Sequence, residues 1–137
     1  MADFLKFIPI VLDNEGFRSN DANDGGGLTI WGLTKVADGK WNGWTLVNQY
    51  IAKNPAYPHG LDEVKEELRQ LAIPYYKTKY WDAVRGDEIN SQEIANKLAD
   101  TDTNTGTVAI KLAQKIAGMP ETGKIDDRLI NYINNEA

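Results

Sequence analysis

The stretch that decides the fold of this chain reads EGFRSNDANDGGGLTIWG, from Glu15 to Gly32. It follows a segment whose apolar residues recur at three- and four-residue spacing, the pattern of an amphipathic helix. These apolar residues are Phe4, Phe7, Ile8, Val11 and Leu12. Gly16 can end that helix, because glycine adopts the positive φ of a helix C-terminus. After the glycines, residues 28–34 predict a short strand or one leg of a hairpin, so the stretch predicts a helix followed at once by a small β element.

The rest of the sequence predicts further helices separated by turns. They are expected at 45–52, at 61–71, from the capping-box-like Asn90-Ser91-Gln92-Glu93 through Leu98, from Val108 to Ile116 closed by Gly118, and from a cap at Asp126 through Ile133. Pro9 predicts either a kink in the first helix or a later start. The expected fold class is therefore mainly α, with a small β element after the first helix. A length of 137 residues predicts one domain, 1–137.

The composition narrows the possible chemistry. The chain has no cysteine, which excludes a disulfide framework, a thiolate nucleophile and a cysteine metal site. His59 is the only histidine, so a serine–histidine triad or a multi-histidine zinc site has too few residues to form. Carboxylate chemistry remains, and it needs no cofactor.

Glu15 and Asp24 form a candidate pair of catalytic carboxyl groups. Glu15 ends an apolar helix, where the helix dipole and nearby core side chains disfavour ionisation, as a general acid requires. Asp24 lies among glycines in a polar setting that keeps a carboxylate ionised, as a base or charge stabiliser requires. Two carboxyl groups in such different environments are typical of enzymes that cleave glycosidic bonds. Asp24 could instead hold the glycine turn, and Thr29, the nearby hydroxyl, could position a water or simply belong to a strand.

Other readings of the same segments are weaker. Asp21 to Gly25 contains carboxylates in a loop, but its glycine spacing differs from a calcium loop and the bidentate glutamate is missing, so no metal is expected. The glycine run lacks the Gly-Lys-Ser/Thr of a phosphate-binding loop. Trp31, Tyr80 and Trp81 are candidates for stacking on sugar rings, with core packing as the alternative for such large aromatic side chains.

Several motifs resemble those of one enzyme family. The segment from Glu15 to Gly32 is similar to the pattern E-G-G-Y…D-x-G-G-x-T-x-x-G of the N-acetylmuramidases of glycoside hydrolase family 108, often labelled secretion-activating proteins. Tyr75 to Ile89 resembles the family's Y-W-D…R-G-D-E-L segment. Asp100, Asn104 and Gly106 fit its D-x-x-x-N-x-G turn, and Gln114 to Gly118 fits the Q…G before a peptidoglycan-binding-like segment. The chain departs from the pattern at Phe17-Arg18, where the family usually has Gly-Tyr, and residues 107–137 resemble only a degenerate form of that segment.

The resemblance implies a lysozyme-like helical fold and hydrolysis of the β-1,4 bond between N-acetylmuramic acid and N-acetylglucosamine, with Glu15 as the acid. A further similarity to phage endolysin-type lysozymes implies roles for Asp24 and Thr29. The expected partners are peptidoglycan glycan strands. Two alternatives remain open, namely a non-catalytic wall-binding or secretion accessory module and a lytic transglycosylase.

Charge and the first residues bear on partners and location. The formal net charge is −5, and Lys and Arg are spread along the sequence, so nucleic-acid binding is not expected. The N-terminal residues lack the basic start and the cleavage site of a signal peptide. The chain is therefore expected to be made in the cytoplasm and to reach the cell wall through a holin-type hole or another export partner.

Overall fold

The computed structural model describes residues 1–20, 28–53, 59–100 and 107–136. The chain forms two compact units, one made of Met1–Pro9 and Tyr76–Ala137 and the other of Ile10–Tyr75. The first is called the outer unit here because it contains both ends of the chain, and the second the central unit. Each unit is described by itself, and the single domain expected from the length stays a prediction.

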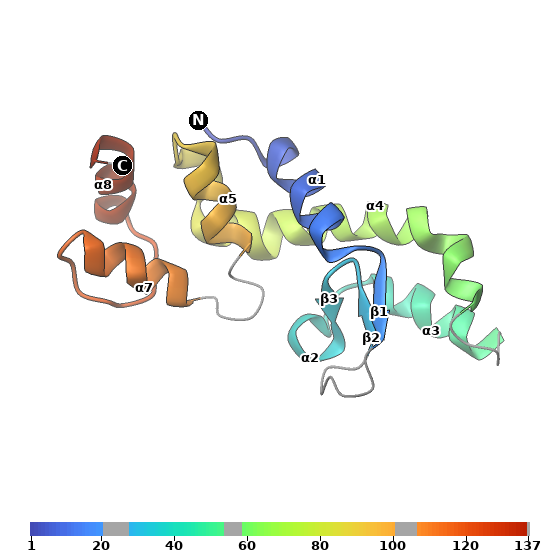
Figure 1. The fold of residues 1–137 in the computed structure, drawn as a ribbon. Coiled ribbons are helices and arrows are strands. Elements are labelled where there is room, and N and C mark those ends of the chain that lie inside the picture. The colour runs from blue at the N-terminus through green and yellow to red at the C-terminus, as the bar shows by residue number, and fades with distance from the viewer. Residues whose placement is uncertain (21–27, 54–58, 101–106, 137) are drawn as a thin grey trace. The chain divides into compact units, whose positions relative to one another are not determined.

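The described residues are mainly helical, with a small sheet directly after the first helix, which confirms the predicted fold class (Figure 1). The α-helices are α1 (Phe4–Glu15), α2 (Lys35–Asp38), α3 (Gly43–Lys53), α4 (Lys65–Tyr76), α5 (Gln92–Asp100), α7 (Thr107–Ile116) and α8 (Asp127–Glu136). Shorter helical segments are η1 (His59–Val64), η2 (Lys77–Trp81), η3 (Asp82–Val84) and η4 (Gly86–Glu88). No helix among the described residues is both long enough and apolar enough to cross a membrane.

The first helix runs unbroken through Pro9, so the later start allowed by the sequence does not occur. Its first turn is capped by Asp3, whose Oδ1 accepts a hydrogen bond from the Leu5 N–H at 2.9 Å. It ends as predicted at Gly16, which has a φ of 71° and donates its N–H to the Leu12 carbonyl oxygen at 2.9 Å.

The sheet has three antiparallel strands in the order β1 (Arg18–Asn20), β2 (Leu28–Ile30) and β3 (Leu33–Thr34). The sequence predicted one strand over residues 28–34, but a turn at Trp31-Gly32 divides this segment into β2 and β3. β1 was not predicted, because Arg-Ser-Asn has no alternation of apolar and polar residues. It is a strand because its backbone pairs with β2, with Ser19 opposite Thr29.

In the central unit, a buried carboxylate organises the helices that follow the sheet. Asp38 is 2% exposed and accepts hydrogen bonds from the Thr34 N–H at 3.0 Å and from the Tyr75 hydroxyl at 3.1 Å. The indole N–H of Trp44 donates to the backbone oxygen of Asp38 at 2.9 Å. Trp41 lies edge-on to Trp44, and the first residue of α3 is Gly43, where a Cβ would lie 2.2 Å from the Trp41 ring. The predicted start at Thr45 is therefore two residues late.

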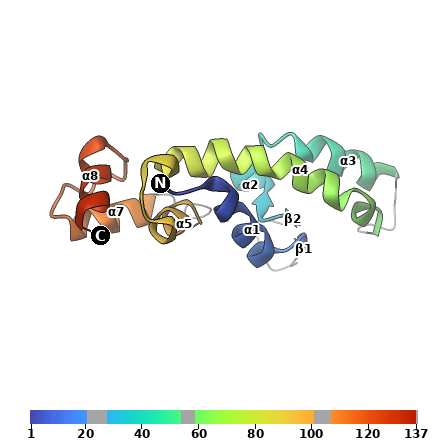
Figure 2. The same ribbon diagram turned by 90° about the horizontal axis from the view of Figure 1, so that it is seen from above.

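The core of the outer unit contains an aromatic cluster around Trp81, which is fully buried. Its ring lies 5.9 Å from the ring of Phe4 and 5.4 Å from that of Phe7, measured between centroids. Gly86 allows the chain to pass this ring, because a Cβ at Gly86 would lie 2.3 Å from it. Tyr80 is 2% exposed and its ring lies 5.2 Å from that of Tyr76. Figure 2 gives a second view of the helices that carry these residues.

The ends of the later helices match the sequence signals. Ser91 caps α5, its Oγ accepting from the Ile94 N–H at 3.2 Å. Gly118 ends α7 with a φ of 72°, and the Met119 N–H donates to the backbone oxygen of Gln114 at 2.9 Å. Asp126 caps α8 by accepting from the Leu129 N–H at 2.8 Å.

Candidate active site

Glu15 is the last residue of α1, and the chain turns at Gly16 directly into Phe17 and β1. The side chain of Glu15 and the whole of Asp24 lie outside the described residues. Asp24 belongs to the segment between Asn20 and Leu28, which are partners in the β1–β2 pair. The predicted pairing of the two carboxyl groups therefore stays a prediction.

Thr29 lies in the middle of β2, the central strand of the sheet. It is the register partner of Ser19 on β1 and of Thr34 on β3, and it is half-buried. The strand role that the sequence allowed for Thr29 is thus observed. Its catalytic role stays a prediction.

Trp31 occupies an unusual backbone conformation just after Thr29. Ile30 and Leu33 are register partners, so Trp31 and Gly32 form a two-residue hairpin turn with φ values of 49° and 82°. Positive φ at both central residues is the geometry of a type I′ turn, which usually contains Asn or Gly. A left-handed conformation costs a residue with a side chain roughly 1–2 kcal/mol. Something else must therefore hold Trp31 in place.

Contacts with Phe17 and Lys65 supply that support. The Trp31 N–H donates to the Phe17 oxygen at 2.6 Å, and its indole Nε1–H donates to the Lys65 backbone oxygen at 3.1 Å. The ring centroids of Phe17 and Trp31 are 5.5 Å apart. Lys65 Nζ lies 5.9 Å from the Phe17 ring and 5.8 Å from the Trp31 ring, within cation–π range. Phe17, Trp31 and Lys65 are called the Lys65 cluster below.

The three predicted sugar-stacking residues lie in two different settings. Trp31 is 7% exposed in the Lys65 cluster, beside the strands that follow Glu15 and contain Thr29. Tyr80 and Trp81 belong to the core of the outer unit, where they are 2% and 0% exposed. Trp81 also donates its Nε1–H to Asp87 Oδ1 at 2.8 Å. Core packing, the alternative left open by the sequence, accounts for Tyr80 and Trp81, while sugar binding by all three stays a prediction.

Sequence reasoning did not single out Asp38 or Lys65. Asp38 is followed by a glycine in the sequence, and its partner Tyr75 comes from a helix distant in sequence. Lys65 lies 34 residues after Trp31 and has no motif around it. In the sequence, neither residue carries a local signal of these contacts.

Among the described residues, most charged groups with a shifted pKa lie around η4 in the outer unit. Hydrogen bonds from Arg85 lower the pKa of Glu88, while hydrogen bonds to Glu88 and Asp127 raise the pKa of Arg85. Burial raises the pKa of Asp100 at the end of α5. In the described part of the chain, no three His, Cys, Asp or Glu side chains gather as metal ligands, and Asp21 to Gly25 falls outside it.

Comparison with known proteins identifies the family. The sequence model described as Glycosyl hydrolase 108 matches residues 8–106, a range that includes Glu15, Asp24 and Thr29. The solved structure of Brucella abortus SagA superposes with a TM-score of 0.71 at 25% sequence identity, covering 98% of this chain and 70% of that one. No match was found among curated proteins. The chain belongs to the glycosyl hydrolase 108 family.

Proposed function

We propose that this protein is an N-acetylmuramidase that hydrolyses the β-1,4 bond between N-acetylmuramic acid and N-acetylglucosamine in peptidoglycan strands. The observation that carries the proposal is the position of Glu15. It ends α1, and the chain continues through Gly16 into the hairpin of β1 and β2 within the segment that matches the glycosidase family.

In the proposed reaction, Glu15 acts as the general acid. Its carboxyl proton passes to the glycosidic oxygen as the bond between that oxygen and the anomeric carbon breaks. A water molecule adds to the anomeric carbon and gives up a proton, with Asp24 as the base or as the stabiliser of the oxocarbenium-like transition state. Thr29 on β2 assists by positioning that water. The protein supplies every group that the reaction needs.

The test is release of reducing ends from purified peptidoglycan by the wild type and by Glu15→Gln. The variant cannot donate the proton, so its rate is expected to fall by roughly 10²–10⁴-fold. Glu63→Gln is the matched control, because it makes the same chemical change at an exposed residue of the central unit. Equal rates for the wild type and Glu15→Gln would overturn the proposal.

The products separate the alternatives. Hydrolysis gives a reducing N-acetylmuramic acid end, whereas a lytic transglycosylase gives an anhydro-sugar. Peptidoglycan binding without either product would indicate an accessory module. NMR of the first-formed anomer shows whether the reaction retains or inverts the configuration at the anomeric carbon. Carboxyl groups about 5–5.5 Å apart favour retention, and groups roughly 6.5–9.5 Å apart favour inversion.

A further inference from the structure

Lys65 has aromatic rings as its described neighbours, whereas Lys77 and Arg85 have carboxylates. Lys77 donates to Asp82 Oδ1 at 2.6 Å, and Arg85 donates to both Glu88 and Asp127. Lys65 is exposed, and no described carboxylate lies within ion-pair distance of its Nζ. Its described neighbours are the faces of two aromatic rings, which attract a cation without neutralising it.

The backbone links this charge to both segments that carry the predicted catalytic residues. Phe17 follows Glu15 by two residues, and Trp31 follows Thr29 by two residues. The hydrogen bond from Trp31 N–H to the Phe17 oxygen joins these segments, and the bond from Trp31 Nε1–H to the Lys65 oxygen adds the start of α4. All of these residues belong to the central unit.

Two ring contacts also limit where the ammonium group can go. A lysine side chain has four rotatable bonds and normally samples many positions, which weakens an exposed ion pair. The rings of Phe17 and Trp31 lie 5.5 Å apart and both lie within about 6 Å of Nζ. They favour a subset of these positions, which lowers the entropy that is lost when an anion binds.

We propose that Lys65 is a specificity-determining residue whose ammonium group binds a carboxylate carried by the glycan substrate. The inference rests on the proposed muramidase function. Peptidoglycan strands carry carboxylates on their stem peptides, whereas a β-1,4-linked N-acetylglucosamine polymer carries none. Lys65 therefore favours strands that carry acidic stem peptides over uncharged strands.

The experiment compares Lys65→Met with the wild type on two soluble substrates. One is peptidoglycan strands with free stem carboxylates, and the other is the same strands after those carboxylates are converted to amides. Lys65→Met is expected to lower kcat/KM about fivefold on the acidic strands, mainly through KM, since an exposed charge pair contributes this order of effect. Its effect on kcat/KM with the amidated strands is expected to be smaller, because those strands lack the carboxylates that Lys65 would bind. Lys65→Arg retains the preference because it retains the charge.

Lys53→Met is the matched control. Lys53 is exposed and its Nζ lies 6.0 Å from the Tyr50 ring, so the substitution removes the same charge from another aromatic contact in the central unit. It is expected to leave the preference for acidic strands intact. The preference of the wild type, and not that of Lys65→Met, should also weaken as NaCl is raised, because salt screens exposed charges.

The outcomes separate the two proposals. If the wild type cleaves neither substrate, the muramidase function is wrong. If it cleaves both and Lys65→Met lowers kcat/KM equally on acidic and amidated strands, the function stands and the inference about Lys65 is wrong. Thermal unfolding of each variant shows whether an equal loss comes from a damaged fold.

Discussion

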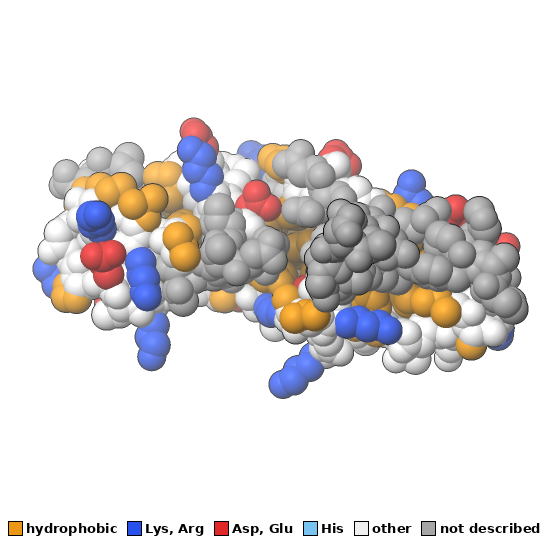
Figure 3. Space-filling view, turned by 60° about the horizontal axis from the view of Figure 1, so that its bottom comes forward, with side chains coloured by type: hydrophobic (Ala, Val, Ile, Leu, Met, Phe, Trp, Pro, Cys, Tyr) orange, Lys and Arg blue, Asp and Glu red, His pale blue; other side chains and the backbone are white. Residues whose placement is uncertain are grey.

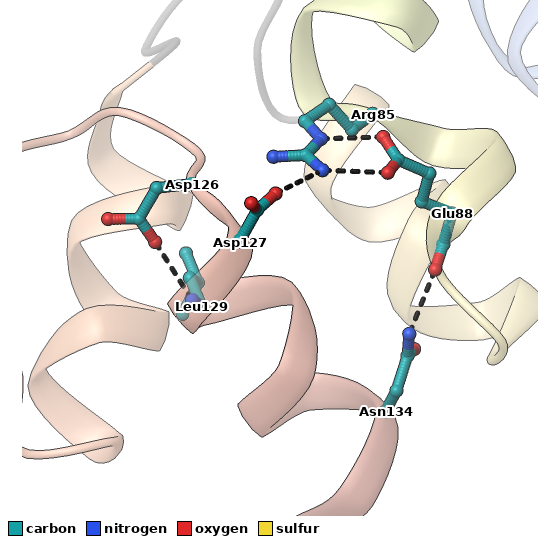
Figure 4. Close-up of polar contacts among 6 residues, drawn as sticks. All are labelled: Arg85, Glu88, Asp126, Asp127, Leu129 and Asn134. Carbon is teal, nitrogen blue, oxygen red and sulfur yellow. Dashed lines mark hydrogen bonds and ion pairs between the residues drawn. The ribbon is translucent and has the colours of Figure 1, made fainter.

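Trp31 and Arg85 invite comparison, because they are the non-glycine residues with positive φ among those the structure describes, at 49° and 55°. Arg85 is held by charge. Its Nη2 donates to Glu88 Oε1 and to Asp127 Oδ1, each at 2.7 Å, and Figure 4 shows the three side chains pointing toward one another. Trp31 is held by ring packing and by a hydrogen bond to the backbone of Lys65. One strained residue thus lies among neutralised charges and the other beside a cation without a described acidic partner.

The Arg85 cation stabilises the fold, whereas the Lys65 cation is proposed to bind an anion. The Arg85 cluster consists of Arg85, Glu88 and Asp127, and it attaches α8 to η4. The Asn134 side chain adds a hydrogen bond from its Nδ2 to the backbone oxygen of Glu88 at 2.9 Å (Figure 4). The Arg85 guanidinium is occupied by these contacts. Figure 3 shows Lys and Arg side chains at several places on one face, among hydrophobic and uncharged side chains. The described neighbours of Lys65 Nζ are instead the aromatic rings of Phe17 and Trp31.

The largest effect is expected from removing the Trp31 ring. Trp31→Ala loses the packing on Phe17 and the indole hydrogen bond while keeping the strained φ, so it should lower the free energy of unfolding by about 3 kcal/mol. Trp31→Gly removes the strain and should be roughly 1 kcal/mol more stable than Trp31→Ala. Urea unfolding followed by circular dichroism measures both. Equal stability of the two variants would show that the turn is not strained.

A smaller loss is expected beside the Arg85 cluster. Gly86→Ala would place a Cβ 2.3 Å from the Trp81 ring, and such overpacking should cost about 2 kcal/mol. Gly118→Ala is the matched control, because it has open space but a φ of 72°, so it should cost only about 1 kcal/mol of strain. Thermal or urea unfolding measures the difference. A Gly86→Ala variant as stable as Gly118→Ala contradicts the packing of this chain segment against Trp81.

The Arg85 cluster should also give stability a pH dependence. The pKa of Glu88 is lowered from 4.5 in the folded protein by its hydrogen bonds with Arg85. A lowered folded pKa gives stability that is present above the unfolded pKa and is lost as the pH falls through the folded value. Urea midpoints of the wild type and Glu88→Gln should therefore differ at pH 7 and converge as the pH falls below 4.5 and through the lowered folded pKa. A constant difference between pH 7 and pH 3 argues against the ionised pair.

The smallest effect is expected for Asp127→Asn. The Asp127 side chain is 87% exposed, and exposed ion pairs contribute little to stability. The melting temperature should fall less than in Glu88→Gln, and the difference from the wild type should shrink as NaCl is raised. A loss that persists at high salt would mean that Asp127 stabilises α8 in another way than through Arg85.

The features that could be predicted from the sequence are those that depend on a few neighbouring residues. Gly16, Gly118 and Asp126 mark helix ends because capping is a local property of the backbone. β1 could not be predicted, because its polar residues form a strand only through pairing with β2. The break between β2 and β3 was missed because a tryptophan rarely adopts the φ of that turn.

The candidate site divides in the same way. Glu15 is a candidate because of the helix end and the motif that follows it, and its catalytic role stays a prediction. The contacts of Lys65 could not be predicted, because they join residues distant in sequence through ring faces and a backbone oxygen. Tyr80 and Trp81 were candidates by residue type alone, and only the packing around them shows that they belong to a core.

The geometry at Asp38 makes its closest isostere a poor substitute. Both carboxylate oxygens act as acceptors, one for the Thr34 N–H at the end of β3 and the other for the Tyr75 hydroxyl in α4. Asparagine has the same shape but replaces one acceptor with an NH₂ donor. Facing the Thr34 N–H, that donor would leave two N–H groups opposed in a site that is 2% exposed. Turning the amide keeps an acceptor opposite the Thr34 N–H but places the NH₂ group at the Tyr75 hydroxyl. That hydroxyl must then accept a hydrogen bond rather than donate one. At this position, therefore, equal side-chain volume does not make a substitution conservative.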